Sequence, residues 1–306
     1  MLSFLKLIRY KNLLMVFLTL VLTKYILINS FTSIFSDFQF ILLAITIISI
    51  TAAGYIINDI YDVEADKINK PSKIFIHKTI TLRNAWFAYS FLTAIGLTLG
   101  VYTSYINGNN SYSIFFISTV ALLYWYSKSL KRIAFIGNIV VSFLTAFTIF
   151  IVLIFEVKNT RSATNLIEVI ANFISSIPVA ITILSYILFA FFITFIREII
   201  KDIEDINGDY ALKMKTLPIL IGIQRTKRVV LVVSSFTFLF ILIILKQELI
   251  HIPILFWYTI LFIICPFAWF FYKLFNAKIS KDFHLLSTII KSIMLFGILS
   301  MLLIKI

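Results

Sequence analysis

Residues 38–66 read FQFILLAITIISITAAGYIINDIYDVEAD, an apolar stretch that runs directly into three aspartates, Asp59, Asp62 and Asp66. A helix of about 20 apolar residues spans the hydrocarbon core of a bilayer. The stretch therefore predicts a membrane helix over Phe38–Ile57, with an acidic cluster where it leaves the membrane.

The rest of the chain has the same apolar character. Of its 306 residues, 61% are hydrophobic and 13% are charged, whereas about a quarter of a soluble domain is charged. Helices satisfy their own backbone groups in lipid, so we predict an all-α polytopic membrane protein with nine transmembrane helices. The predicted spans are Leu13–Ile28, Phe38–Ile57, Ala85–Ile106, Asn110–Ser127, Ile133–Phe155, Ile177–Ile196, Val229–Leu245, Ile252–Tyr272 and Leu285–Ile304.

The basic residues predict how the chain crosses the membrane. If the N-terminus lies in the cytoplasm, 21 of the 27 Lys and Arg fall in inner segments and 5 in outer segments. Cytoplasmic loops carry such an excess, so the N-terminus and the aspartates are expected on the cytoplasmic side of an inner membrane. Residues 1–12 are expected to form a short interfacial helix. The net charge is +13, but the basic residues lie between apolar runs and form no continuous face. This argues against a nucleic-acid partner.

The sixth predicted span runs into a second acidic cluster, REIIKDIEDINGD at residues 197–209. Its aspartates Asp202, Asp205 and Asp209 repeat the spacing of the first cluster at an offset of 143 residues. This internal repeat predicts one domain over residues 1–306, made of two related halves at about 1–145 and 146–306.

Each cluster points in one direction. A helix turns by about 100° per residue, so each set of three aspartates falls within an arc of roughly 60°. Glu198 joins the second arc, whereas Glu64 and Glu204 are expected to point away. Carboxylates at this spacing repel each other, and hard oxygen ligands suit Mg²⁺, which also bridges to substrate phosphates. We therefore predict that Mg²⁺ is held by Asp59, Asp62, Asp66, Asp202, Asp205 and Asp209.

Further motifs accompany the two clusters. They are Asn58-Asp59-x-x-Asp62-x-x-x-Asp66, Asp202-x-x-Asp205-x-x-x-Asp209, Arg9-x-x-Asn12, Tyr126-Ser127-x-x-Leu130-Lys131-Arg132 and Gly137-Asn138. Together they resemble the motifs of the UbiA-type intramembrane prenyltransferases. The resemblance implies nine helices around a cavity open to the cytoplasm. It also implies that aspartate-bound Mg²⁺ holds the diphosphate of an isoprenoid donor.

The second motif indicates a group within that family. Residues 197–209, followed by Lys215-Thr216-Leu217-Pro218-Ile219 and Gly222, resemble the digeranylgeranylglyceryl phosphate synthases. Those enzymes add a second geranylgeranyl chain to geranylgeranylglyceryl phosphate through an ether bond. The loop after the first motif departs from that group, with Ser72-Lys73-Ile74 and Ile76-His77-Lys78. An aromatic acceptor of the quinone, homogentisate or naphthoate type is therefore the alternative to a lipid acceptor.

The resemblance and the chemistry together suggest residue roles. Breaking the bond to an allylic diphosphate leaves extra negative charge on the leaving oxygens, which positive groups stabilise. Lys131 and Lys201 are expected to supply such charge, and Asp66 to serve as a base for the acceptor. The remaining diphosphate-binding residues are expected to be Arg9, Asn12, Asn58, Tyr126, Arg132 and Arg197. The phosphate of a lipid acceptor is expected to contact Lys70, Lys73, Lys78 and Arg83.

A small-solute transporter is the alternative outside enzymes. Transporters place ionisable groups and broken helices near mid-membrane. Here Lys24 is expected to extend outward to the interface and Lys291 to lie about two turns inside its span. Pro178, Pro253 and Pro266 form no matched breaks in the two halves. The acidic groups lie at helix ends, which favours an enzyme that binds a diphosphate.

Overall fold

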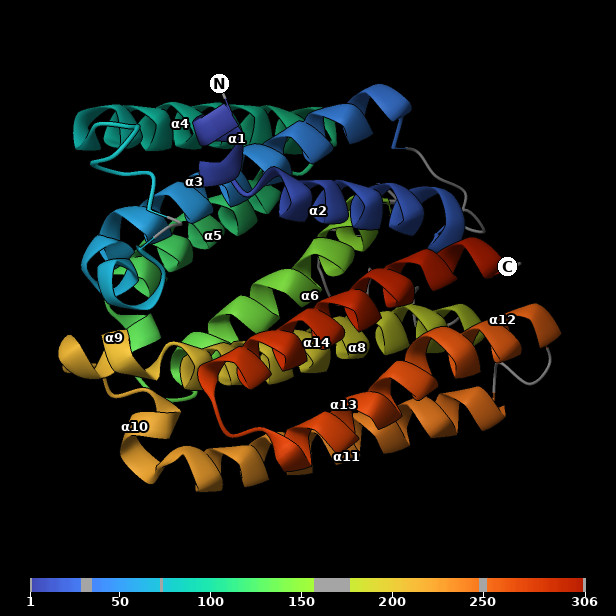
Figure 1. The fold of residues 1–306 in the computed structure, drawn as a ribbon. Coiled ribbons are helices and arrows are strands. Elements are labelled where there is room, and N and C mark those ends of the chain that lie inside the picture. Colours follow the sequence, from blue (N-terminus) through green and yellow to red (C-terminus); the bar gives the residue numbers. More distant parts are fainter. Residues whose placement is uncertain (1, 29–34, 72–73, 157–176, 248–251, 305–306) are drawn as a thin grey trace.

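The computed structural model describes residues 2–28, 35–71, 74–156, 177–247 and 252–304, and these residues form helices without a β-strand. Figure 1 shows the long helices in one bundle. The first half contains α2 (Tyr10–Leu22), α3 (Asp37–Asn69), α4 (Leu82–Ile106), α5 (Ser113–Lys128) and α6 (Ile136–Glu156). The second half contains α8 (Ile177–Glu204), α11 (Ile223–Gln247), α12 (Pro253–Thr259), α13 (Cys265–Asn276) and α14 (Ser280–Ser300).

Shorter helices connect or extend these elements. The predicted interfacial segment contains α1 (Leu2–Leu7), and α9 (Ile206–Ala211) and α10 (Leu217–Ile221) follow α8. Two π-helical turns, η1 (Thr23–Leu27) and η6 (Ile260–Ile264), continue α2 and join α12 to α13. Three 3₁₀ turns complete the described chain, η3 (Asn110–Tyr112), η4 (Leu130–Arg132) and η7 (Met301–Leu303).

Every predicted span lies on a helix, which confirms an all-α membrane protein. Eight helices of the described chain are long and apolar enough to cross a bilayer. The one other predicted span, Asn110–Ser127, corresponds to α5, which has 16 residues. At about 1.5 Å per residue α5 is about 24 Å long, shorter than a bilayer core of about 30 Å. A count of nine transmembrane helices therefore remains a prediction.

The acidic motif of α3 lies beyond the apolar part of the helix. Ser36 caps α3, since its side chain accepts from the Gln39 backbone at 3.2 Å and its own N–H donates to the Gln39 side chain at 2.8 Å. The helix has 33 residues and is about 50 Å long. This length carries Asp59, Asp62 and Asp66 past the apolar segment on a continuous, rigid helix.

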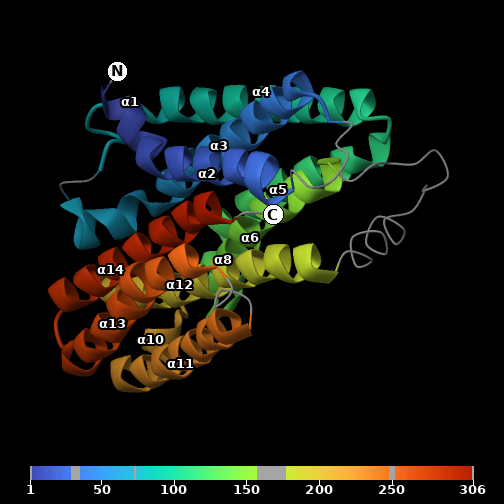
Figure 2. The same ribbon diagram turned by 90° about the vertical axis from the view of Figure 1, so that its right-hand side faces the viewer.

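Two large buried clusters hold the bundle together. One joins η1, α3, α5 and α6 through residues such as Leu43, Phe116 and Phe155. The other joins α8, α11, α13 and α14 through residues such as Phe267 and Ile290. In both Figure 1 and Figure 2, α4 and α11 lie at opposite edges of the molecule.

Glycines allow close helix contacts in the first cluster. A Cβ on Gly96 would lie 2.6 Å from the Ile50 side chain, and one on Gly100 would lie 2.6 Å from the Phe116 ring. Small residues at such positions let membrane helices pack closely. They bring α4 against α3 and α5.

The division into two related halves at about residues 145 and 146 stays a prediction, and both residues lie within α6. One expectation from the sequence needs correction. Lys24 does not extend to the interface: it is 7% exposed and pairs at 2.9 Å with Glu156, which is 2% exposed. The buried carboxylate offers Lys24 a partner within the bundle, so the lysine stays inside.

Candidate active site

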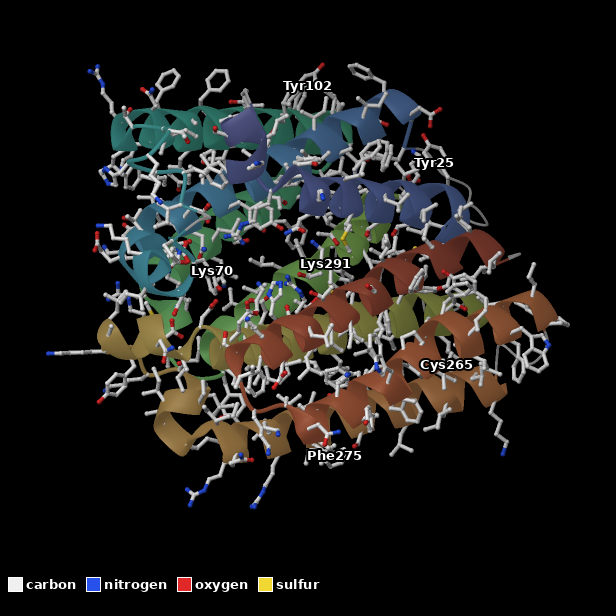
Figure 3. The ribbon with its side chains drawn as sticks, viewed as in Figure 1. Tyr25, Lys70, Tyr102, Cys265, Phe275 and Lys291 are labelled. Carbon is white, nitrogen blue, oxygen red and sulfur yellow. The ribbon has the colours of Figure 1, made fainter. Side chains whose placement is uncertain are left out.

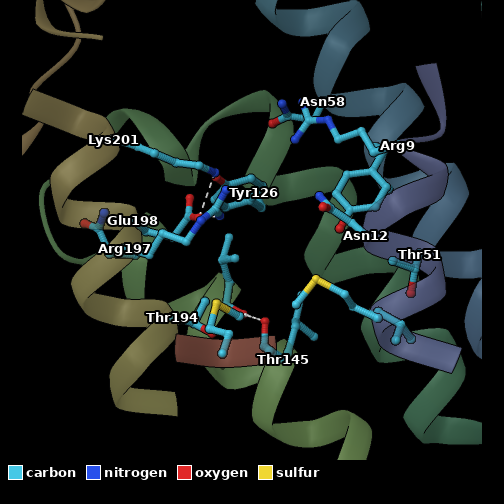
Figure 4. A pocket seen from close by; sticks show the side chains of 18 of the residues that line it. Arg9, Asn12, Thr51, Asn58, Tyr126, Thr145, Thr194, Arg197, Glu198 and Lys201 are labelled. Atoms are coloured by element: carbon cyan, nitrogen blue, oxygen red, sulfur yellow. Dashed lines mark hydrogen bonds and ion pairs between the residues drawn. The ribbon is translucent and has the colours of Figure 1, made fainter. Parts of the chain in front are cut away.

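A cavity of about 910 Å³ lies between the two halves, and both acidic motifs line it. All six predicted aspartates contribute to its wall: Asp59, Asp62, Asp66, Asp202, Asp205 and Asp209. Most of the predicted basic and polar residues line it as well: Arg9, Asn12, Asn58, Tyr126, Lys131, Arg197 and Lys201. Figure 4 shows several of these side chains around the hollow. The fold thus brings the repeated motifs together, as the spacing predicts.

The carboxylates on α3 have basic and amide partners from other elements. Arg9 Nη2 donates to Asp59 Oδ1 at 2.7 Å. Lys131 Nζ donates to Asp62 Oδ1, and Asn58 Nδ2 donates to Asp62 Oδ2 at 2.7 Å. The Asp66 carboxylate has no hydrogen-bond or ion-pair partner among the described residues.

Arg9 reaches Asp59 because of an unusual backbone conformation. Its φ of 52° and ψ of 53° turn the chain between α1 and α2. The guanidinium carbon also lies 4.9 Å from the centroid of the Tyr55 ring, a favourable cation–π position. The two contacts fix a positive group beside the first motif.

The second motif has matching partners. Asn138 Nδ2 donates to Asp202 Oδ2 at 2.9 Å, and Lys70 Nζ donates to Asp205 Oδ2 at 2.5 Å. The other oxygen of Asp205 is buried and has no partner in the described part of the chain. Burial raises the pKa of Asp209 to about 7, and the nearby Asp205 charge adds to the rise. Both features indicate that the carboxylates of Asp205 and Asp209 have too few positive or hydrogen-bonding partners.

Asn69 joins the two motifs directly. Its Nδ2 donates to the Asp205 carbonyl at 2.8 Å, and its Oδ1 accepts from the Gly208 N–H at 2.8 Å. A Cβ on Gly208 would lie 2.4 Å from Asn69 and 2.8 Å from the Ala65 carbonyl. Glycine is therefore required where α9 crosses the end of α3.

The predicted basic residues of α8 pair with an acid on the same helix. Glu198 Oε1 accepts from Lys201 at 2.8 Å and from Arg197 Nη1 at 3.0 Å. Lys201 and Arg197 therefore reach the cavity with Glu198 between them. Another predicted residue, Asn12, accepts through its Oδ1 from Lys291 at 2.7 Å.

Arg132 does not reach the site, contrary to the prediction. It is exposed and absent from the cavity wall, whereas its neighbour Lys131 lines it. Consecutive residues of the 3₁₀ turn η4 point in different directions, so one faces inward and the other outward. The Arg132 carbonyl instead accepts from the Lys215 backbone at 2.8 Å.

Other side chains also differ from expectation. Glu204 lines the cavity and accepts from His284 at 2.9 Å, so it does not point away. Lys78 donates to the Pro71 carbonyl at 2.6 Å and is exposed. Arg83 is exposed outside the cavity wall, and Lys73 lies outside the described residues. Of the four residues expected to contact an acceptor phosphate, Lys70 is thus the one found in the cavity wall.

The donor set fits a hard divalent cation, although its carboxylates do not yet converge on one point. Within the described ranges, no three acidic, histidine or cysteine side chains are arranged to hold a metal ion as they stand. The reason is visible in the ion pairs, because Asp59, Asp62 and Asp205 each turn toward a basic side chain. The unpartnered Asp205 oxygen and the raised pKa of Asp209 show that added positive charge would stabilise the group.

The deeper part of the cavity is apolar. Its walls come from six helices and the turn η7, and include Met15, Ile47, Ile50, Phe116, Leu123, Val141, Leu144, Phe147, Tyr186, Phe189, Ile193, Met294, Ile298 and Met301. A polar end joined to a long apolar part suits a ligand with a charged head and a hydrocarbon tail.

Sequence reasoning assigned no role to three residues of this site. Asn69 follows Asp66 by three residues and continues the same helix face, a signal that could have found it. Asn138 stands in a quoted motif, but nothing in its spacing indicates Asp202 as its partner. Tyr55 lies one helical turn before Asp59, but its contact with Arg9 depends on the turn between α1 and α2.

Comparison with known proteins defines the class. Residues 15–294 match the UbiA prenyltransferase family, so the chain belongs to this family of membrane proteins.

Curated relatives make the likeness more specific. The chain is 36% identical over 195 residues to the digeranylgeranylglyceryl phosphate synthase of Saccharolobus solfataricus, a match covering 62% of this chain and 59% of that protein. It is 32% identical over 204 residues to the enzyme of the same name from Sulfurisphaera tokodaii, covering 64% and 65%. The match thus spans less than two thirds of the length of these relatives.

Solved structures agree on the fold. One, from a study of digeranylgeranylglyceryl phosphate synthase in membranes, has a TM-score of 0.63 at 22% identity and covers 98% of this chain and 96% of the other. A UbiA homologue from Archaeoglobus fulgidus bound to GPP and Mg²⁺ has a TM-score of 0.61 at 15% identity, covering 98% and 99%. These likenesses confirm the expected helical architecture.

Proposed function

We propose that this protein transfers a geranylgeranyl group from its diphosphate to the hydroxyl of geranylgeranylglyceryl phosphate. The observation that carries the proposal is one cavity whose polar end holds six aspartates, three of them paired with basic side chains, and whose deep end is apolar. The similarity to relatives named for this reaction supports the choice of donor and acceptor. The basic loops support a cytoplasmic position for the polar end.

The aspartates of α3, α8 and α9 would hold Mg²⁺ together with the donor diphosphate. Bound there, Mg²⁺ would neutralise the charge that develops on the leaving oxygens. The residues best placed for this are Asp59, Asp62, Asp202 and Asp205, with Asp66 and Asp209 at the ends of the two motifs.

The basic partners of these aspartates have a second role in this proposal. Arg9, Lys131 and Lys70 are held on Asp59, Asp62 and Asp205. When the carboxylates bind a cation instead, these side chains become free to contact phosphate oxygens. Arginine suits bidentate contacts and lysine a point-charge contact. The cavity thus keeps its basic groups near the site before the donor arrives.

The apolar wall would hold the prenyl tail and exclude water from the reacting carbon. The carbon–oxygen bond to the diphosphate breaks and the leaving group takes the electron pair. The acceptor oxygen then bonds to the allylic carbon and gives up its proton. Asp66 lines the cavity, and its carboxylate has no hydrogen-bond partner among the described residues, so it is the proposed base.

The proposal is tested with purified protein in lipid vesicles. We expect geranylgeranyl diphosphate, Mg²⁺ and geranylgeranylglyceryl phosphate to yield a dialkyl glyceryl phosphate and diphosphate, detected by mass. Chelation of the metal with EDTA should stop product formation, and restored Mg²⁺ should recover it. Turnover of 4-hydroxybenzoate, homogentisate or a naphthoate, with none of the glyceryl phosphate, would show that the acceptor is aromatic.

A further inference from the structure

Lys291 is a charged residue inside a membrane-spanning helix, and the ion pairs of the two motifs do not involve it. It is the twelfth residue of α14, which has 21 residues. Figure 3 labels Lys291 between α2 and α14. Among the described residues no carboxylate lies within ion-pair distance of Lys291, and its Nζ donates instead to the neutral Asn12 at 2.7 Å.

The position of Lys291 on α14 directs it into the cavity. The residues of α14 that line the cavity include His284, Ser287, Lys291, Met294 and Ile298. Their steps alternate between three and four residues, so they form one face of the helix. Lys291 therefore belongs to the cavity wall and not to a lipid-facing surface.

Two contacts fix the depth of Lys291. The antiparallel helices α8 and α14 meet at Glu204 and His284, 2.9 Å apart, and again at Tyr186 and Ser300, 2.7 Å apart. Seven residues inward from the first contact, α8 carries Arg197 and α14 carries Lys291. Both are therefore about 10 Å deeper than that contact.

The surroundings of Lys291 are positively charged. The charges of Arg197, Lys11 and Arg9 act on it, and of these Arg197 and Arg9 are each paired with a carboxylate. Arg197 uses Nη1 to contact Glu198, while its buried Nε has no partner in the described chain. Asn12 accepts from Lys291, which leaves the amide N–H groups of Asn12 directed away from the lysine.

Arg197 and Lys291 lie deeper in the cavity than the motif that would hold the donor diphosphate. Asp202 is five residues after Arg197 on α8, so the two differ in depth by about 7–8 Å. In a glyceryl phosphate about four bonds, or about 5 Å, separate the free hydroxyl from phosphorus. A phosphate held at Lys291 would thus let the hydroxyl reach toward the carbon attached to the donor diphosphate.

We propose that Lys291, together with Arg197 Nε and Asn12, binds the phosphate of the acceptor lipid. The inference rests on the proposed function and deepens it, because it names a second anion site apart from the aspartate motifs. A membrane-buried cavity with unpaired positive charge is stabilised by an anionic ligand. An acceptor without an anionic group would leave Lys291 unpaired.

The test compares Lys291→Met with Lys281→Met. Lys281 lies on the same helix, but it is exposed and outside the cavity wall, so its loss removes the same charge without touching the site. We expect Lys291→Met to raise the KM for geranylgeranylglyceryl phosphate by at least about 30-fold and to change the donor KM by less than about twofold. Lys281→Met should leave both constants within about twofold of the wild type. Lys291→Arg should recover most of the loss.

Phosphate-free geranylgeranylglycerol separates the possible outcomes. Wild type and Lys291→Met should convert this acceptor equally and slowly if Lys291 serves the phosphate. Equal rises in donor and acceptor KM would place Lys291 at the donor site, and an unchanged acceptor KM would remove it from binding; either overturns the inference. If Lys291→Met does not fold, as judged by its melting temperature in detergent, Lys291→Gln serves the same comparison. Failure of the proposed function itself would be seen as no glyceryl phosphate product from the wild type.

Discussion

Asp59 and Glu64 lie on the same helix, yet their surroundings differ. Asp59 is 17% exposed and pairs with Arg9 from another element, whereas Glu64 is 65% exposed and pairs with Lys67 one turn away. A pair on an exposed helix surface contributes about 0.3–0.5 kcal/mol. We therefore expect Glu64→Gln to have little effect on activity or stability.

Asp59→Asn keeps the size of the side chain but removes its charge. We expect turnover to fall at least about 100-fold, because the cavity loses a group that stabilises charge in the transition state. Asp202→Asn should have an equal effect, whereas Glu64→Gln should stay within about twofold of the wild type. Turnover numbers and melting temperatures in detergent check this. Near-normal turnover in Asp59→Asn and Asp202→Asn would rule out the aspartate motifs as the site.

At the residue scale, periodicity could predict which side chains face the cavity but not what they contact. The 59, 62 and 66 spacing places three aspartates on one face whatever surrounds the helix, and the structure confirms that face. The contact of Lys70 with Asp205 joins positions 135 residues apart. Such a contact depends on how α3 meets the end of α8, and no local pattern records it.

At the scale of the element, α8 forms one wall of the cavity from end to end. Its lining residues include Tyr186, Phe189, Ile193, Arg197 and Asp202. Tyr186 lies 16 residues before Asp202, which corresponds to about 24 Å along the helix. The Tyr186 hydroxyl bonds to Ser300 at 2.7 Å, and this contact closes the deep end between α8 and α14.

This geometry predicts a limit on the length of the prenyl chain. A chain reaches about 1.2 Å per bond, so the roughly 16 bonds of four isoprene units extend about 19 Å. Five units extend about 24 Å, which takes up the whole distance from Asp202 to Tyr186 and leaves no room for the diphosphate. We expect Tyr186→Ala to lower the preference for a 20-carbon over a 25-carbon donor by at least about tenfold in kcat/KM. Tyr186→Phe keeps the ring and should preserve the preference. If the alanine and phenylalanine variants behave alike, Tyr186 does not set the length.

Most helices could be predicted from apolar length alone, because lipid leaves the backbone few alternatives. The irregular elements could not. The π-helical turn η1 contains Lys24 and η6 lies just before Pro266, but neither residue by itself specifies a π-helical turn. The left-handed turn at Arg9 likewise follows from packing of α1 and α2 and not from a glycine.

At the scale of the whole molecule, both acidic motifs lie at the same end of the bundle. Asn69 and Lys70 of the first half contact Asp205 at that end, and the Lys215 backbone contacts Arg132 there. At the opposite end the Gln39 side chain donates to the Ile106 carbonyl at 3.1 Å. The basic loops belong to the motif end, which predicts that this end faces the cytoplasm.

Labelling of single cysteines tests that orientation. Ala211 at the end of α9 and Asn110 in η3 are both exposed, and they lie near the motif end and the opposite end of the bundle. Each is changed to cysteine in a Cys265→Ala background, which removes the one native cysteine of the chain. Intact cells are treated with a membrane-impermeant maleimide. Because the positive-inside rule places the motif end inside, we expect labelling at position 110, and at position 211 only after the membrane is permeabilised. Labelling at 211 but not at 110 in intact cells would invert the topology. Both substrates would then have to reach the cavity from outside the cell.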